Sequence, residues 1–291
     1  MKFSITVYYH INLKLKHLKI HVYYIVNMKF VIIDASYYIF FRYYSVKNWW
    51  GFARDISEPE NVEESERGME KFRTTFISKI EELLKKLNIE NHILLIGKDC
   101  PQKTIWRHKD ICEYKGNRKN QDNVKPMFEC AFNEKLFEKA GAKSILKYPE
   151  LEADDCIAIT TKHILEKYDD VHIYIITSDM DYLQLAGEKV TLVDLKYKDL
   201  TDSKNSFKDA KKDLFCKIVC GDKSDNIPSI FPRCGIKTAA KLYDNPEDFK
   251  TKLEKTPGAK EIYERNQKII DFNYIPQELV DGFKKDMLLL K

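Results

Sequence analysis

Glu152-Ala153-Asp154-Asp155 and, one predicted strand later, Thr177-Ser178-Asp179-Met180-Asp181 indicate both the fold and the chemistry of this chain. The apolar residues of 156–165 recur at helical spacing, so Glu152 and Asp155 begin a helix on one shared face. The apolar run 171–176 indicates a buried strand that carries Asp179 and Asp181 at its C-terminal end. Open parallel sheets bind ligands at the carboxyl ends of their strands, so acids placed there and at a helix start predict a metal site.

Other acids repeat this placement. Asp34 ends the apolar run 30–33, and Asp99 follows the run 92–97. Asp222 and Asp225 stand three residues apart in a turn sequence that ends in Pro228. The candidate metal ligands are Asp34, Asp99, Glu152, Asp154, Asp155, Asp179, Asp181, Asp222 and Asp225. For an isolated Asp a helix N-cap is the simpler interpretation, but acids at several matching element ends favour the metal site.

Electrostatics limits how these acids can be arranged. Two carboxylates ~5 Å apart repel by about 3 kcal/mol at an effective dielectric constant of ~20. If all nine acids converged as carboxylates, their summed repulsion energy would therefore exceed the net stability of a domain, which is about 5–15 kcal/mol. The acids must lie apart, be protonated, or hold divalent cations. Because the set contains no His or Cys, it suits Mg²⁺ or Mn²⁺ better than zinc.

Charge is more informative by segment than in total. The 291-residue chain has a formal net charge of +4, and residues 1–27 alone carry four lysines and no acid, so the remainder is neutral. The pI therefore does not argue for a nucleic-acid partner, and any basic surface must be local. The seven cysteines show no metal-ligand spacing, which favours reduced thiols in an intracellular protein.

The N-terminal extension, 1–27, differs from the rest of the chain. Its lysines interrupt every apolar run, so neither a membrane span nor a signal peptide is expected. Met1-Lys2-Phe3 recurs as Met28-Lys29-Phe30 directly before the first predicted strand. Our hypothesis is that the functional protein starts at Met28 and that 1–27 is disordered or not translated; the alternative is a basic arm. A mature N-terminus at Met1, found by mass spectrometry, would contradict the hypothesis.

Strands alternating with helices predict an α/β fold with a mostly parallel sheet and flanking helices. We expect an aromatic helix from residue 36, an amphipathic helix over 70–87, an amphipathic stretch over 128–139 and a further strand over 190–194. Polar residues 196–212 form a connection, and the chain from about 213 is all helical. The predicted division is a catalytic domain over 28–198 and a DNA-binding domain over 199–291 that contributes Asp222 and Asp225.

Two stretches suit contacts with nucleic acid. Within 101–125, seven Lys or Arg residues outnumber three acids and alternate with Trp106 and Tyr114, although a solvated basic loop is an equally good interpretation. Gly235 precedes a predicted helix with Lys237 and Thr238 in its first turn. Such a helix start can hold a phosphate, although a simple capped helix is the safer interpretation of this pattern alone.

Taken in order, these motifs resemble the 5′–3′ exonuclease and flap endonuclease family, in particular its bacterial and phage branch. The resemblance covers the chain from about Met28 to its end. It rests on the acids together with Tyr114-Lys115-Gly116-Asn117-Arg118, Gly221-Asp222-Lys223-Ser224-Asp225-Asn226-Ile227-Pro228 and Gly235-Ile236-Lys237-Thr238. It implies a PIN-like domain with a helical arch, a C-terminal helix–three-turn–helix module, and Mg²⁺-dependent hydrolysis of DNA, with RNA–DNA hybrids as further substrates. The expected partner is DNA with a 5′ end, flap or duplex junction, bound by a monomer.

The resemblance also implies residue roles. Asp34, Asp99, Glu152, Asp154 and Asp155 would hold one cation, and the remaining four acids a second; Mn²⁺ should substitute for Mg²⁺. Lys115 and Arg118 would contact the scissile phosphate. The expected DNA contacts are Arg107, Lys119, Gly235, Lys237 and Thr238.

Two departures from the family pattern matter. The segment after Asp99 is one residue longer before Trp106 than is usual. The turn before Gly235 lacks the usual first glycine and carries an extra residue, which argues against a K⁺ site there. Since no polymerase domain follows, we expect a standalone nuclease acting in replication or repair.

Two other functions remain open. A non-catalytic DNA-binding scaffold on the same fold is disfavoured because every acid position is filled. A phosphatase with Asp34 as nucleophile would need an acid at residue 36, which is Ser36.

Overall fold

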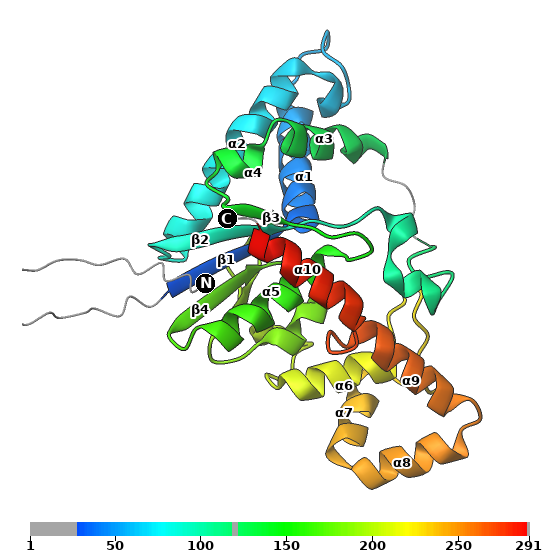
Figure 1. Ribbon diagram of the computed structural model, residues 1–291. Helices are drawn as coiled ribbons and strands as arrows, with labels where there is room; N and C mark the ends of the chain where they lie inside the picture. The colour runs from blue at the N-terminus through cyan, green and yellow to red at the C-terminus, as the bar shows by residue number, and fades with distance from the viewer. Residues whose placement is uncertain (1–27, 118–121, 290–291) are drawn as a thin grey trace, which may run out of the picture.

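The computed structural model describes residues 28–117 and 122–289 and contains a five-stranded parallel sheet in the order β3-β2-β1-β4-β5 (Figure 1). The strands are β1 (Met28–Asp34), β2 (His92–Gly97), β3 (Ser144–Leu146), β4 (Val171–Ile176) and β5 (Val190–Val193). This confirms the predicted α/β class. The expectations for 1–27, Arg118 and Lys119 lie outside the described residues. Within the described residues, no helix combines the length and apolar character that crossing a bilayer requires.

The central strand β1 explains why both faces of the sheet are covered. Successive side chains of a strand point to opposite faces of the sheet, and β1 has apolar residues facing both sides. Val31 and Ile33 belong to one buried cluster, whereas Phe30 and Ile32 belong to another on the opposite face. A strand that is apolar on both sides gains most when helices pack on both faces.

The two faces carry different helices (Figure 1). One side is covered by α1 (Ala35–Ala53), α2 (Glu66–Lys86), α3 (Lys125–Asn133) and α4 (Leu136–Lys139). The other is covered by α5 (Ala153–Lys167) and α10 (Gln277–Leu289). The predicted apolar stripe of α2 is confirmed, because Phe72, Phe76 and Ile80 are buried. The amphipathic stretch over 128–139 forms two helices, since Lys135 has a left-handed φ of 56° between them.

The C-terminal helices form a smaller unit beside the sheet. They are α6 (Ala210–Cys220), α7 (Ile236–Asp244), α8 (Pro246–Lys255) and α9 (Ala259–Ile270). These helices share a core that also receives Ile105 and Tyr114 from the basic segment. After α9 the chain returns to the sheet, where Phe272, Leu279 and Phe283 join the cluster beneath α5. The last helix thus packs with the first unit, although it lies within the predicted second domain.

The region between β2 and α3, where the family resemblance places a helical arch, is described only in part. Its described part contains the short 3₁₀ helices η2 (Gln102–Thr104), η3 (Trp106–Lys109) and η4 (Asp122–Val124). Lys115 has a positive φ of 55°, which interrupts any continuous helix. The three-residue strand β3 was missed by the sequence analysis because so short an element shows no periodicity.

Candidate metal centre

The acids at the strand ends lie where the parallel register predicts. Ile33 of β1 pairs with Ile96 of β2 and with Ile176 of β4, so Asp34, Asp99 and Asp179 follow neighbouring strands at one edge. Asp34 caps α1 by accepting a hydrogen bond from Tyr37 N at 3.1 Å. Asp99 accepts from Ala153 N, the first residue of α5, at 2.9 Å and from Ser36 Oγ at 2.5 Å. Asp99 therefore ties together the starts of α1 and α5.

Tyr182 lies buried beside these acids and donates a hydrogen bond to one of them, Asp34. It lies in the 3₁₀ helix η5 (Met180–Leu185), and its buried hydroxyl donates to Asp34 Oδ2 at 3.3 Å. Burial, together with the charges of Asp34, Asp154, Asp179 and Asp99, raises the pKa of Tyr182 well above its usual value, so the hydroxyl remains a donor. Burial, followed by the charge of Asp99, raises the pKa of Asp34 to about 7. These acids thus share one electrostatic environment.

A first acidic cluster opens α5. One oxygen each of Glu152, Asp154 and Asp155 lies within 4.8 Å of the others. Asp155 Oδ2 accepts from the backbone N–H of Glu152 at 3.1 Å, which is the reciprocal half of a capping box. Burial, then the charge of Asp155, raises the pKa of Asp154 well above its usual value. This cluster agrees with the predicted shared face at the helix start.

Arg107 is enclosed beneath this cluster, which corrects the prediction that it contacts DNA. The residue is only 2% exposed. Its guanidinium donates to both oxygens of Asp155 at 2.7–2.8 Å, to Glu152 Oε2 at 2.8 Å and, through Nε, to the carbonyl of Ile269 at 2.9 Å. Arg107 therefore joins the basic segment, the start of α5 and the end of α9. A basic residue after a strand end does not reveal by its sequence whether it faces solvent or an internal acid.

Asp155 is a predicted ligand whose oxygens accept several hydrogen bonds from the protein. It is 0% exposed, and besides Arg107 and Glu152 N it accepts from Trp106 Nε1 at 3.0 Å. Four donors of the protein meet the two oxygens of Asp155, against three for Glu152, so the geometry favours Asp155 as a residue that orients Arg107 and the start of α5.

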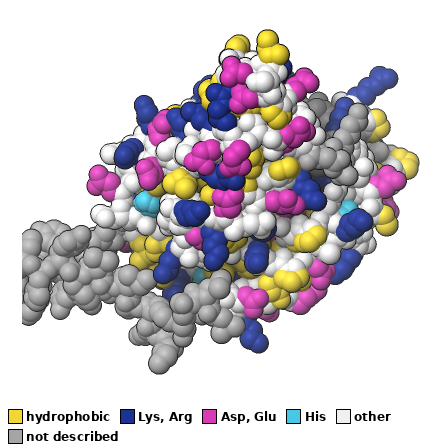
Figure 2. Space-filling model, turned by 90° about the horizontal axis from the view of Figure 1, so that it is seen from above, with side chains coloured by type: hydrophobic (Ala, Val, Ile, Leu, Met, Phe, Trp, Pro, Cys, Tyr) yellow, Lys and Arg dark blue, Asp and Glu magenta, His cyan; other side chains and the backbone are white. Residues whose placement is uncertain are grey.

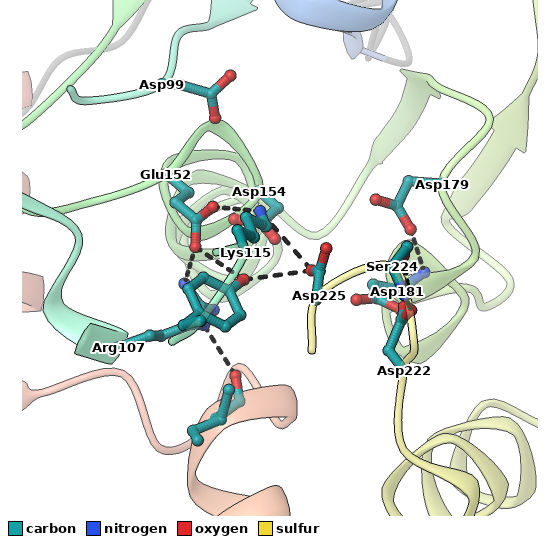
Figure 3. A network of polar contacts seen from close by, with 12 residues as sticks. Asp99, Arg107, Lys115, Glu152, Asp154, Asp179, Asp181, Asp222, Ser224 and Asp225 are labelled. Atoms are coloured by element: carbon teal, nitrogen blue, oxygen red, sulfur yellow. Dashed lines mark hydrogen bonds and ion pairs between the residues drawn. The ribbon is translucent and has the colours of Figure 1, made fainter. Parts of the chain in front are cut away.

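A second acidic cluster joins η5 to the turn between α6 and α7. One oxygen each of Asp181, Asp222 and Asp225 lies within 4.8 Å of the others. Gly221 begins the turn with φ 67° and ψ −170°, a conformation essentially restricted to glycine. Asp222 Oδ1 accepts from Ser224 N and Oγ at 2.7 and 2.6 Å. Figure 3 shows Asp225 between the two groups of acids.

Lys217, on α6, is the residue of this cluster that the sequence analysis missed. Its Nζ lies 2.5 Å from Asp181 Oδ1 and 2.5 Å from Asp222 Oδ2. Burial alone would raise the pKa of Asp222, but hydrogen bonds from Lys217 and Ser224 outweigh it and lower this pKa to about 2. Burial, then the charge of Asp179, raises the pKa of Asp181 to about 7 despite Lys217. The available signal was the spacing, since Lys217 precedes Asp222 by five residues across a helix end.

Tyr114 and Lys115 bridge the two clusters, and Figure 3 shows Lys115 close to Glu152. Lys115 Nζ contacts Glu152 Oε1 and lies 3.7 Å from Asp225 Oδ2. The Tyr114 hydroxyl lies 3.0 Å from Glu152 Oε2 and 3.4 Å from Asp225 Oδ2. The backbone N–H of Lys115 also donates to the carbonyl of Asp225 at 3.0 Å. The structure therefore places Lys115 between the two acidic clusters.

The predicted phosphate-binding turn lies elsewhere, at the start of α7. Gly235 is its N-cap, and Gly235, Ile236, Lys237 and Thr238 are exposed. The residues of the first turn of this nine-residue helix therefore lie at the surface.

On the face shown in Figure 2, Lys and Arg side chains are interspersed with Asp and Glu, in agreement with the neutral charge of residues 28–291.

The site fits a hard divalent cation. Its ligand atoms are carboxylate oxygens, which Mg²⁺ and Mn²⁺ prefer. Among the described residues, the buried Asp181 Oδ1 accepts no hydrogen bond of normal geometry, although the Lys217 ammonium lies beside it as an ion-pair partner. A buried oxygen whose partner is a cation of the protein is also suited to coordinate a metal cation.

Comparison with known proteins agrees with this geometry. Residues 29–214 match the family model "5′-3′ exonuclease, N-terminal resolvase-like domain". The 5′-3′ exonuclease of Buchnera aphidicola is 30% identical over 242 residues, which is 79% of this chain and 76% of that protein. The flap endonuclease of Escherichia phage T5 is 29% identical over 173 residues, 55% of this chain and 57% of that enzyme.

A solved structure shares the fold. The T5 D15 flap endonuclease, in a pseudo-enzyme–product complex with DNA and metal ions, superimposes with a TM-score of 0.60 at 22% identity. The match covers 90% of this chain and 98% of that one.

Proposed function

Because the chain belongs to the 5′-3′ exonuclease family, we propose that it is a divalent-metal-dependent nuclease that cleaves DNA from 5′ ends and at 5′ flaps. The observation that carries the proposal is the convergence of acids from three strand ends, the start of α5 and the turn between α6 and α7. The all-carboxylate ligand set favours Mg²⁺, with Mn²⁺ able to substitute.

The acids divide into two ligand groups. Asp34, Asp99, Glu152 and Asp154 would hold one cation, while Asp155 orients Glu152 through Arg107. The second group is Asp179, Asp181, Asp222 and Asp225. When bound, a pair of such cations would lower the pKa of a water molecule and stabilise the leaving oxygen.

The basic and aromatic side chains of the site have their own tasks. The Lys115 ammonium, placed between the two clusters, would pair with the scissile phosphate and offset its growing negative charge. Tyr182 and Tyr114 donate hydrogen bonds that hold Asp34 and Glu152 in fixed rotamers. Arg107 is a positioning residue, because it contacts the carboxylates and is enclosed by protein.

Binding of DNA would use a surface outside the acidic clusters. The exposed start of α7, with Lys237 and Thr238, suits the phosphates of a duplex. Arg118 and Lys119 remain predicted contacts near the cut. We expect the monomer to engage a 5′ end, a flap or a duplex junction.

One assay tests the proposal. Labelled 5′-flap, blunt-duplex and single-stranded DNAs are incubated with the protein in Mg²⁺ and in chelator, and the products are resolved at nucleotide level. We expect Mg²⁺-dependent 5′ fragments, lost in Asp154→Asn and retained in Asp248→Asn, which changes an exposed acid of α8. Cleavage that persists in chelator, or in Asp154→Asn, would contradict the proposal.

A further inference from the structure

The second acidic cluster contains a cation of the protein itself. Lys217 extends from α6, and its ammonium lies 2.5 Å from one oxygen each of Asp181 and Asp222. The three side chains are largely buried, with exposed fractions of 24% for Lys217, 17% for Asp181 and 18% for Asp222. The single positive charge of the ammonium is thus shared between two of the three acids that come within 4.8 Å of one another in this cluster.

The ammonium lies where a cation held by both Asp181 and Asp222 would have to lie. Oxygen ligands lie about 2.0–2.1 Å from Mg²⁺ and about 2.3–2.6 Å from Ca²⁺. The nitrogen of Lys217 is at a comparable distance from the same two oxygens. A divalent cation and an ammonium group cannot share this space, because both their volumes and their positive charges conflict.

We propose that Lys217 is an internal counter-ion that competes with the divalent cation of the second cluster. Without that cation, the ammonium bridges Asp181 and Asp222 and keeps η5 joined to the α6–α7 turn. When the cation binds, the ammonium swings away on its flexible four-carbon stem. Lys217 thereby lowers the affinity of the second acidic cluster for its cation relative to the affinity of the first cluster, and it makes the second cation exchangeable. This inference rests on the proposed metal-binding function.

The test measures metal affinity without DNA or catalysis. Lys217→Met removes the charge but keeps much of the side-chain volume. Lys212→Met is the matched control, because Lys212 lies on the same helix, is 17% exposed and pairs with Asp244 at 2.7 Å outside the acidic clusters. Each protein is stripped of metal and titrated with Mn²⁺. Binding is monitored by calorimetry and by the electron paramagnetic resonance signal of free Mn²⁺.

We expect the weaker Mn²⁺ site to tighten by about tenfold or more in Lys217→Met, because the cation no longer meets a positive charge at the same two oxygens. The tighter site, and both sites of Lys212→Met, should stay unchanged. In chelator, Lys217→Met should unfold at a lower temperature than the native protein, with the difference removed by Mn²⁺. An unchanged or weaker second affinity would overturn the inference, because a merely structural lysine would not alter the relative affinities of the two sites.

A second variant keeps the inference testable if Lys217→Met does not fold. Lys217→Arg keeps the positive charge, so its weaker site should stay as weak as in the native protein, and tightening there would refute the competition. If the native protein bound no Mn²⁺, the proposed metal-dependent function would itself fail. Binding at two sites with no response to Lys217→Met would overturn only the role of Lys217.

Discussion

Arg107→Met tests the internal charge balance of the site most directly. In the native protein the guanidinium makes four hydrogen bonds to Asp155, Glu152 and Ile269, and its side chain is 3% exposed. Its removal leaves Asp155, with 0% exposure, as a buried carboxylate without a positive partner at its oxygens. Breaking a buried pair in this way costs about 3–5 kcal/mol, so we expect that loss in the free energy of unfolding.

The measurement is urea unfolding of the chelated protein. Arg67→Met is the control, because the pair of Arg67 with Glu58 is at the surface and such pairs contribute about 0–1 kcal/mol. Arg107→Met/Asp155→Asn should recover part of the loss, since the variant no longer buries an unpaired charge. If Arg107→Met lost less than about 1 kcal/mol and mainly weakened DNA binding, Arg107 would be a DNA contact and the reasoning would be refuted.

Four further outcomes are expected. Lys115→Ala should lower turnover by about 10²–10³-fold, the usual effect of removing one preorganised electrostatic donor, while duplex affinity changes far less; equal losses in both would count against its role. Lys237→Ala should weaken DNA binding and reduce the slope of log affinity against log salt by about 1, as for one lost phosphate contact. Gly221→Ala should cost about 1–3 kcal/mol of stability, because a Cβ there would lie 2.5 Å from the carbonyl oxygen of Ile227; thermal unfolding measures it. Finally, Asp34 and Asp181 have pKa values raised to about 7 from 3.8 in the folded protein without metal, so the folded state binds more protons than the unfolded state above pH 4. The stability of the chelated protein should therefore fall as pH rises from about 4 to about 7, and Asp34→Asn or Asp181→Asn should flatten this fall.

The sequence was sufficient for the acids because their placement depends on local signals. The apolar runs before Asp34, Asp99 and Asp179 predict strands, and parallel strands in register bring their carboxyl ends to one edge. The capping pattern of Glu152 and Asp155 likewise depends on neighbours within one helical turn. Interactions of this kind can be read from a few consecutive residues.

The balance of charge could not be read in this way. The sequence argument allowed the acids to lie apart, to be protonated or to hold metal, and it did not consider cations of the protein. The structure adds the charges of Arg107, Lys115 and Lys217, which contact Glu152, Asp155, Asp181 and Asp222. Protonation also contributes, because burial raises the pKa values of Asp34 and Asp181.

Local chemistry thus predicted which acids gather at the edge of the sheet, whereas the folded chain decided which bases accompany them. Arg107 meets Ile269 across 162 residues of sequence. The return of α10 to the sheet likewise joins segments far apart in the chain. The physical reason is that a charged side chain loses its hydration when it is buried, and consecutive residues do not show whether a distant partner will compensate for that loss. The choice between solvent and a buried partner depends on the desolvation and pairing that long-range packing imposes.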